Sequence, residues 1–278
     1  MNEVKIGIEI ECVLNGIIHH IEQGDYHDGL PVDGLERWKA EHDGSLSTKN
    51  DFGRWGECIE IISPIFQSKE EFQEELKKFY EKFSKNNQFE LNEVLRFNNT
   101  CGSHVHFSIK DFSFDKKVIF AIYPKVRRYF KKKLLNSNIK GKYSIWSHYG
   151  RSYAKIIDEN NFKEQRHQEF NFESEKDGRG LEWRSPNLLK IRTWKDFFAF
   201  WDIVYESLEY LYEIAQNYEE TKDIELLNKE DFENIEREIH AQNEENFIPL
   251  KAKKRKKSYS KLNVKLNNLE GEEIECVI

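Results

Sequence analysis

The sequence predicts an α+β protein built around a mostly antiparallel sheet. Several short segments alternate apolar and polar residues, which is typical of strands with one buried face. Longer segments repeat apolar residues at three- and four-residue steps, as amphipathic helices do. The two kinds of segment do not alternate one by one along the chain, so the regular βαβ units of a parallel sheet are not expected.

The strand segments each carry a local signal. The first alternates from Val4 onward, and the second is a β-branched run that stops at Ser63-Pro64. Gly102 precedes the third, and the last two are short apolar stretches. The predicted strands are 4–14, 57–65, 104–109, 170–172 and 181–185.

The helical segments follow the spacing of their apolar residues. In the first helix Ser68 is a plausible N-cap, and an apolar stripe runs from Phe72 to Phe83. The second helix has a basic face and contains Pro124, which could kink it. The predicted helices are 69–87, 116–135, 193–216 and 229–242.

Composition places the chain among globular proteins with a packed core. Its 278 residues are 38 % apolar and 14 % aromatic, which excludes collagen-like and disordered classes. No linker-like stretch divides residues 1–217, so they are predicted to form one domain. Residues 218–278 are predicted to be a charged helical extension and tail, in which an acid-rich stretch precedes the basic run 251–257. That run is either a solvated tail or a contact for a phosphate-rich partner.

Charge and cysteine usage indicate a cytoplasmic protein. The apolar runs are too short to span a membrane, and the acidic N-terminal stretch does not resemble a secretory signal. Four cysteines in a chain of this length do not form a disulfide framework, which favours a reducing compartment. A net charge of -7 gives no general case for binding nucleic acid. Nothing in the sequence predicts an oligomeric state.

The first predicted strand carries two carboxylates on one face. Because strand side chains alternate, Glu9 and Glu11 point the same way, and Ile8 and Ile10 point the other way. Two neighbouring carboxylates repel each other and are costly to desolvate. Such a face needs either water or cations over it.

The same two-faced pattern recurs on the other strands. His104 and His106 share a face, Glu182 and Arg184 share another, and Glu60 lies among β-branched residues. One shared polar face explains these strands together. Carboxylates suit Mg²⁺ or Mn²⁺, which commonly bridge phosphate oxygens, and Arg184 supplies a positive charge for such a phosphate.

Three other features of the sequence leave alternatives open. Glu57 faces away from Glu60 in a regular strand, although a bulge could change which carboxylate reaches a metal. Cys101 could be a nucleophile with His104, although a small buried thiol is the commoner reading. The histidines of segment 17–38 belong to a solvated loop or to an adventitious metal site. The sequence contains no P-loop, no Cys-x-x-Cys pair and no Gly-x-Ser-x-Gly elbow.

Five short motifs in order resemble the amidoligase family, relatives of glutamine synthetase and the glutamate–cysteine ligases. The resemblance spans about residues 4–190. Its motifs are Gly7-Ile-Glu-Ile-Glu11, His42-Asp-Gly-Ser-Leu46, Glu60-Ile-Ile-Ser-Pro64, Cys101-Gly-Ser-His-Val-His106 and Gly180-Leu-Glu-Trp-Arg184.

The resemblance implies a carboxylate–amine ligase with a glutamine-synthetase-like fold. In that fold helices pack on the convex side of a curved sheet, and the concave side binds ATP with Mg²⁺ or Mn²⁺. ATP converts a carboxylate to an acyl phosphate, which an amine then displaces to form an amide. The partners are a carboxylate and an amine, and a peptide or protein is a plausible substrate because the aromatic segment 143–153 could line a groove.

The resemblance also implies roles for single residues. Metal ligands would be Glu9, Glu11, Glu60, Glu182 and one of His104 and His106, with His104 favoured. Phosphate contacts would be Arg184, Arg166 and Arg151. Substrate contacts would be Asn171, Asp43 and Ser45, the last two of which could equally form a simple Asp-Gly turn.

Two alternative functions use the same residues. The first is a metal-dependent phosphoesterase or nuclease, which would cleave phosphodiesters without ATP at the acidic face. The second is a binding relative without turnover, which would have no need for the full set of acids, His104 and Arg184.

Overall fold

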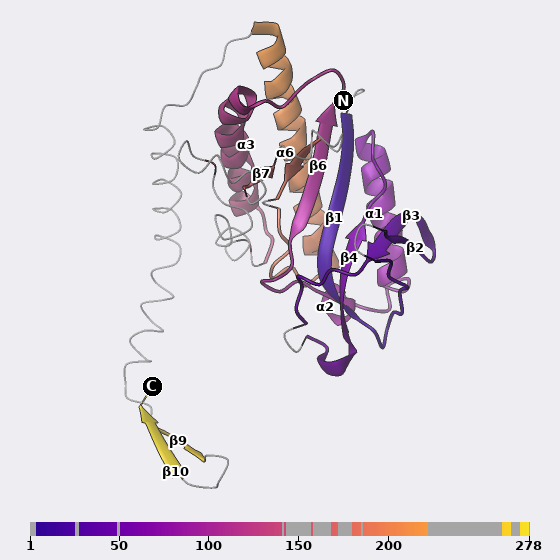
Figure 1. Cartoon of the computed structure of the whole chain (residues 1–278), viewed down its shortest axis with the longest axis vertical. Coiled ribbons are helices and arrows are strands. Elements are labelled where there is room, and N and C mark those ends of the chain that lie inside the picture. The colour runs from indigo at the N-terminus through magenta and orange to yellow at the C-terminus, as the bar shows by residue number, and fades with distance from the viewer. Residues whose placement is uncertain are drawn as a thin grey trace. The chain divides into compact units, whose positions relative to one another are not determined.

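The computed structural model is an α+β fold, as the sequence predicts (Figure 1). It describes residues 4–25, 28–48, 51–140, 142, 157, 168–171, 180–184, 186–221, 263–267 and 273–277. The chain divides into two compact units, Met1–Leu226 and Leu227–Ile278.

The first unit is built on a sheet in which all described strand pairs are antiparallel. The strand order is β2-β3-β4-β1-β6-β8-β7, and β5 also pairs with β1. The long central strand β1 therefore lies between β4 and β6. The strands are β1 (Val4–Asn15), β2 (Leu30–Val32), β3 (Leu35–Glu41), β4 (Gly56–Ile62), β5 (Leu95–Arg96), β6 (Ser103–Ile109), β7 (Phe170–Asn171) and β8 (Leu181–Trp183).

Three long helices pack on one face of this sheet (Figure 1). They are α1 (Lys69–Phe83), α3 (Lys116–Asn136) and α6 (Trp194–Thr221), and the short helices are η1 (Gly53–Trp55) and α2 (Leu91–Val94). Trp38 of β3 lies 5.1 Å from Phe79 of α1 between ring centroids, and Trp183 of β8 lies 5.0 Å from Phe130 of α3. The apolar face of the sheet and these helices form the core.

Helix α1 begins where the sequence predicts and ends four residues earlier. Ser68 caps it, because its Oγ accepts a hydrogen bond of 3.1 Å from the backbone N–H of Glu71. Past Phe83 the chain turns through Lys85, Asn86 and Asn87, which all have positive φ angles (47°, 56° and 71°). A left-handed backbone cannot continue a right-handed helix, so α1 ends with its apolar stripe at Phe83 and not at the predicted residue 87.

The other predicted long helices are confirmed with small shifts. Helix α3 runs through Pro124 and is capped by Asp115. Helix α6 continues beyond residue 217, the predicted domain boundary, to Thr221. The predicted helix 229–242, the basic run 251–257 and the aromatic segment 143–153 lie outside the described residues.

The prediction of a loop over 17–38 is wrong for part of that segment. Strands β2 and β3 form a hairpin there, joined by Asp33 and Gly34, with Gly34 at a φ of 73°. The pairing register shifts at Pro31, and charged residues interrupt the apolar alternation, so the pattern hides the strands. An Asp-Gly dipeptide between such segments is a hairpin signal.

The second unit contains one hairpin among its described residues. Strands β9 (Asn263–Asn267) and β10 (Glu273–Val277) pair antiparallel, and the sequence predicted no strands in this part of the chain. Among the described residues of both units, no helix has the length and apolar character needed to cross a membrane.

Candidate active site

The polar residues of six neighbouring strands, β3, β4, β1, β6, β8 and β7, share one face of the sheet. In antiparallel pairs, residues directly opposite one another project from the same side. Glu9 lies opposite His104, and Glu11 lies opposite Glu60. The remaining opposite pairs are Glu60 with Glu41, His106 with Glu182, and Glu182 with Asn171. The other side carries the buried Ile8, Ile10, Ile61, Val105 and Trp183. We call the polar side the acidic face.

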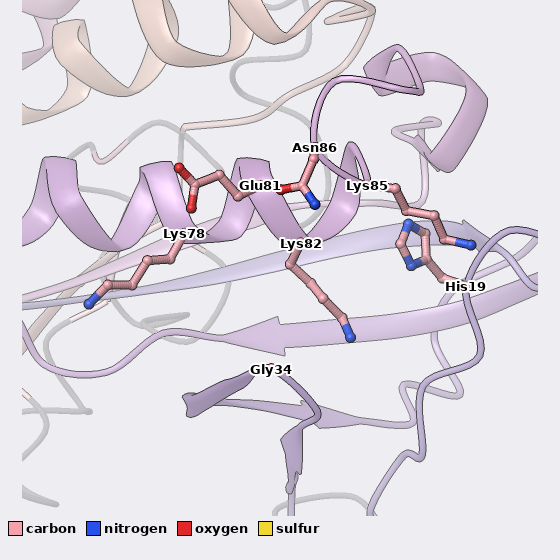
Figure 2. Close-up of a pocket in the computed structure, with 7 residues that line it drawn as sticks. All are labelled: His19, Gly34, Lys78, Glu81, Lys82, Lys85 and Asn86. Atoms are coloured by element: carbon pink, nitrogen blue, oxygen red, sulfur yellow. The ribbon is translucent and has the colours of Figure 1, made fainter.

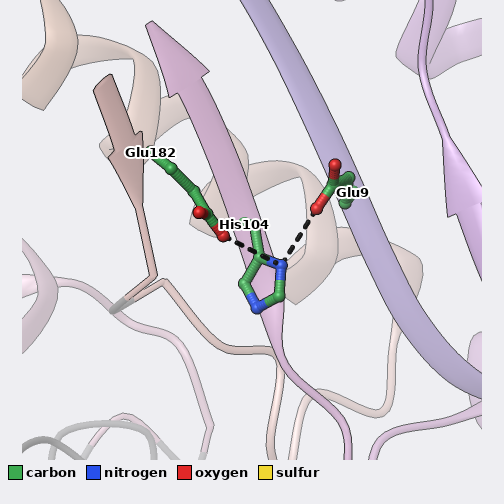
Figure 3. A group of neighbouring side chains, drawn as sticks. All are labelled: Glu9, His104 and Glu182. Carbon is green, nitrogen blue, oxygen red and sulfur yellow. Dashed lines mark hydrogen bonds and ion pairs between the residues drawn. The ribbon is translucent and has the colours of Figure 1, made fainter. Parts of the chain in front are cut away.

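Glu9 is the central carboxylate of this face. It contacts both histidines. Its Oε1 lies 2.9 Å from His106 Nε2, and its Oε2 lies 3.0 Å from His104 Nδ1 (Figure 3). Burial raises the pKa of Glu9, but the hydrogen bonds and charges of the two imidazoles outweigh burial and hold that pKa well below its usual value. Glu9 is therefore ionised at neutral pH.

The neighbouring row brings three carboxylates together. Glu11, Glu60 and Glu41 are all buried on adjacent strands. Burial raises the pKa of Glu60 to about 10, helped by the charges of Glu9, Glu11 and Glu41. Burial also raises the pKa of Glu11, against the opposing charge of His104. This row is electrostatically unfavourable unless a proton or a cation joins it.

Two triads on the acidic face have donor atoms close enough to share an ion. One is Glu9, His104 and Glu182, and the other is Glu11, Glu60 and His104; in each, the ligand atoms lie within 4.8 Å of one another. Figure 3 shows Glu9 and Glu182 approaching the same edge of the His104 ring from two strands. Among the described residues, both triads contain His104 and neither contains His106.

Comparison with known protein families identifies the family of the chain. The family model described as "putative amidoligase enzyme" matches residues 2–171. The chain belongs to this amidoligase family. No curated protein matches the chain.

The family match ends at β7, so Glu182 and Arg184 of the acidic face lie beyond it. Glu182 and Arg184 come from β8 and the residue after it, and β8 pairs with β6 next to the histidines. Hydrogen bonds hold both carboxylate oxygens of Glu182. Its Oε2 accepts one of 2.7 Å from Asn171 Nδ2, and its Oε1 accepts one of 2.6 Å from Arg184 Nη1. Arg184 Nε is buried and has no hydrogen-bond partner among the described residues.

Gly102 lies against the acidic face, beside the side chains of Glu11 and His104. Its backbone N–H donates a hydrogen bond of 2.5 Å to Glu11 Oε2. A Cβ at this position would lie 3.1 Å from His104 Nε2 and 3.2 Å from Glu11 Oε2, so any side chain would crowd both. A glycine is needed here for close approach of the backbone to the acidic face.

The strand register decides between the two acids of β4. Pairing of β4 with β1 is continuous from Gly56 to Ile62, so Glu60 lies on the acidic face and Glu57 on the other. The sequence analysis missed Glu41, because it did not identify β3. The alternation of Trp38 and Ala40 with Lys39 and Glu41 is the only local signal for it.

The remaining predicted site residues are placed less centrally. Asp43 is buried, and its charge raises the pKa of Glu11. Its Oδ1 accepts a hydrogen bond of 2.7 Å from the backbone N–H of Ser45, and Ser45 itself is exposed. This is an Asx turn close to the acidic face. Arg151 and Arg166 lie outside the described residues.

The thiols near the site are protonated. Burial raises the pKa of Cys101 to about 12, and the charge of Glu11 adds to the effect. Because a thiolate is the reactive form, Cys101 is poorly suited to be a nucleophile. Cys12, Cys58 and Cys101 form no disulfide.

Proposed function

We propose that the chain is an ATP- and Mg²⁺-dependent carboxylate–amine ligase that forms an amide bond through an acyl phosphate. ATP would phosphorylate the substrate carboxylate and release ADP, and the amine would then displace phosphate from the acyl carbon. The observation that carries this proposal is the convergence of four carboxylates and His104 on one face in a member of the amidoligase family.

A divalent cation fits this donor set on electrostatic grounds. The raised pKa of Glu60 reflects negative charge that burial leaves uncompensated. Carboxylate oxygens suit Mg²⁺ and Mn²⁺, and Mn²⁺ also accepts an imidazole. When bound, such a cation would neutralise the phosphate oxygens of ATP.

The shared histidine limits how the two triads can be filled. His104 Nδ1 lies 3.0 Å from Glu9 and 3.5 Å from Glu182, whereas Nε2 lies 3.7 Å from Glu11. A neutral imidazole has one lone pair and can ligate one ion. We infer that one ion would use His104 and that carboxylates alone would hold a second.

Arg184 is the phosphoryl contact in this proposal. Glu182 orients its guanidinium through the bond of 2.6 Å to Nη1. The guanidinium would place positive charge at the edge of the acidic face, where the transferring phosphoryl group develops negative charge. A glutamine-synthetase-like arrangement would place ATP over this face and the amine near Asp43.

Calorimetric titration of ATP with Mg²⁺ tests the proposal. Wild type is expected to bind the nucleotide only with the metal, and the Glu9→Gln/Glu182→Gln variant is expected to lose this binding. Glu57→Gln is the matched control, because it removes a carboxylate from the other face of β4. Release of ADP is then screened over pairs of amines and carboxylates, with a rate loss of about a hundredfold expected in Glu9→Gln.

Two results would contradict the proposal. Nucleotide binding that survives in the double variant would move the site away from the acidic face. Mn²⁺-dependent cleavage of a phosphodiester without ATP would instead identify a phosphoesterase on the same residues.

A further inference from the structure

A cavity at the C-terminal end of α1 shares no lining residue with the acidic face. This open cavity of about 380 Å³ is lined by the last turns of α1, the turn that follows, the β2–β3 turn and the segment after β1. Its lining residues are His19, Gly34, Lys78, Glu81, Lys82, Lys85 and Asn86 (Figure 2). None of them is a residue of the acidic face.

The charges in this cavity are unequally compensated. Lys78 is already paired, at 3.1 Å to Glu74 and 2.9 Å to Glu75. Lys82 reaches only the fully exposed Asp33, at 3.4 Å, which is a weak pair in water. Among the described residues, no carboxylate lies within ion-pair distance of Lys85. Two ammonium groups therefore face the cavity, and the carboxylate of its lining, Glu81, pairs with Lys77 outside it at 3.8 Å.

His19 gives the cavity a buried polar wall. It is 6 % exposed, and its Nε2 lies 2.8 Å from the carbonyl oxygen of Phe83. Because a carbonyl can only accept, Nε2 carries the proton and Nδ1 carries the lone pair of the neutral ring. Nδ1 has no partner among the described residues. Burial lowers the pKa of His19, and the charges of Lys85 and Lys82 lower it further, so the ring is neutral.

The backbone around the cavity is held in an uncommon conformation. One left-handed residue is enough to end a helix, yet Lys85, Asn86 and Asn87 are all left-handed. Such residues are costly when they are not glycine and persist where surrounding contacts impose them. Here hydrogen bonds from Asn86 N–H to Glu81 O (3.1 Å) and from Asn87 N–H to Ser84 Oγ (3.0 Å) fix the turn. The turn brings Lys85 and Asn86 back over the cavity.

We propose that this cavity binds a monoprotonated phosphate group, with Lys82 and Lys85 as its ionic partners and His19 Nδ1 accepting its proton. The ligand is inorganic phosphate or the phosphate of a small monoester. A neutral acceptor beside two cations distinguishes phosphate from sulfate, because hydrogen phosphate has an O–H to donate and sulfate at neutral pH has none. Asn86 can donate to a remaining oxygen through its side-chain amide.

The binding test uses the full chain in EDTA, without divalent metal or ATP. Inorganic phosphate, adenosine monophosphate and sulfate are titrated calorimetrically at pH 6.5, where the monoester, with a second pKa of about 6, keeps a protonated fraction. Phosphate or the nucleotide is expected to bind at least about tenfold more tightly than sulfate. Tighter binding of inorganic phosphate would identify the free anion as the ligand, and tighter binding of the nucleotide would identify a monoester.

Three variants locate the binding and test the role of each group. The Lys82→Gln/Lys85→Gln variant is expected to weaken phosphate binding by at least about tenfold. His19→Gln keeps an N–H group that can donate to the carbonyl oxygen of Phe83, but it lacks the Nδ1 acceptor. This variant is therefore expected to lose the preference for phosphate over sulfate. Lys69→Gln is the matched control, since it removes one charge from the first turn of the same helix, where its partner Glu209 lies outside the cavity lining.

Three results would overturn the proposal. They are absence of phosphate binding up to about 10 mM, unchanged binding in the double lysine variant, and equal affinity for phosphate and sulfate in wild type. Binding of phosphate at the acidic face would instead require metal and would not respond to these lysines, so the test is independent of the proposed ligase activity.

Discussion

In the proposed metal site, Glu60 would serve metal binding at the expense of stability. It is buried between Glu11 and Glu41, and its pKa of about 10 indicates that the metal-free protein holds it protonated at neutral pH. A protonated carboxyl resembles a glutamine in shape and charge. A divalent cation would have to displace that proton, so metal binding and the charge of this residue are coupled.

Glu60→Gln should therefore separate stability from metal binding. In EDTA the variant is expected to unfold at the same temperature as wild type or at a higher one, because it removes a carboxyl whose ionisation is unfavourable. With MgCl₂ or MnCl₂, wild type should be stabilised and the variant should not. Thermal unfolding with and without metal measures both effects. If Glu60→Gln is stabilised by metal as much as wild type, Glu60 is not a ligand.

The two histidines should differ in their effect on metal affinity. Both triads contain His104, whereas His106 contacts only Glu9 in the described acidic face, through the bond of 2.9 Å. We expect His104→Ala to weaken Mn²⁺ binding by about 10- to 100-fold, and His106→Ala to weaken it less. Calorimetric titration of Mn²⁺ compares them. A larger loss in His106→Ala would reverse the assignment.

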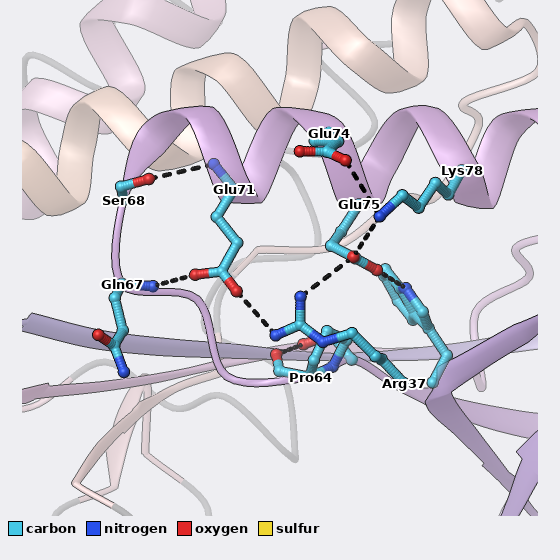
Figure 4. A network of polar contacts seen from close by, with 10 residues as sticks. Arg37, Pro64, Gln67, Ser68, Glu71, Glu74, Glu75 and Lys78 are labelled. Atoms are coloured by element: carbon cyan, nitrogen blue, oxygen red, sulfur yellow. Dashed lines mark hydrogen bonds and ion pairs between the residues drawn. The ribbon is translucent and has the colours of Figure 1, made fainter.

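At the scale of elements, a polar network fixes α1 against the sheet. Figure 4 shows Glu75 of α1 meeting Arg37 of β3 and Lys78 of its own helix. Glu75 Oε2 also accepts a hydrogen bond of 3.1 Å from Trp38 Nε1 in the core. Burial raises the pKa of Glu75, but the bonds from Lys78 and Trp38 and nearby positive charges outweigh it, so the pKa is lowered. The ionised carboxylate is the form that joins helix and sheet.

This network predicts a pH-dependent contribution to stability. Because the folded pKa of Glu75 is lower than the unfolded value, its contribution is present above about pH 4.5 and is lost as pH falls through the folded pKa. Glu75→Gln should cost about 1–2 kcal/mol in the free energy of unfolding at pH 7 and much less at pH 3.

Urea denaturation at both pH values measures that difference. Glu74→Gln is the control, because the Glu74 side chain is 68 % exposed and contacts only Lys78 in the described network. An equal loss at pH 3 and pH 7 would show that shape rather than charge matters at position 75.

The strands also differ in how well the sequence predicts them. The alternation of β1, β4 and β6 determined which side chains share the acidic face, because a period of two leaves no other arrangement of Glu9, Glu11 and Glu60 in regular strands. Hairpin β2–β3 was missed, because its register shift at Pro31 breaks that period. The contacts of His104 with Glu11 and Glu182 could not be predicted, since strand order is a property of the whole sheet.

At the scale of the whole molecule, all the described residues of the acidic face belong to the first unit. Its sheet, its three long helices and both triads lie within Met1–Leu226. The last part of its core is α6, in which Leu208, Leu211 and Ala215 are buried. The sequence-based boundary at 217 falls inside this helix, because composition changes before the helix ends.

A chain ending at Leu226 should therefore fold and keep its metal response. It is expected to show the cooperative unfolding of the full chain and the same rise in unfolding temperature with MnCl₂. A chain ending at Ser207 removes the buried Leu208, Leu211 and Ala215, and should be destabilised by about 3–6 kcal/mol. Thermal unfolding of the three chains, with and without metal, makes the comparison. If the chain ending at Leu226 folds but no longer responds to MnCl₂, residues of the second unit contribute to the metal site.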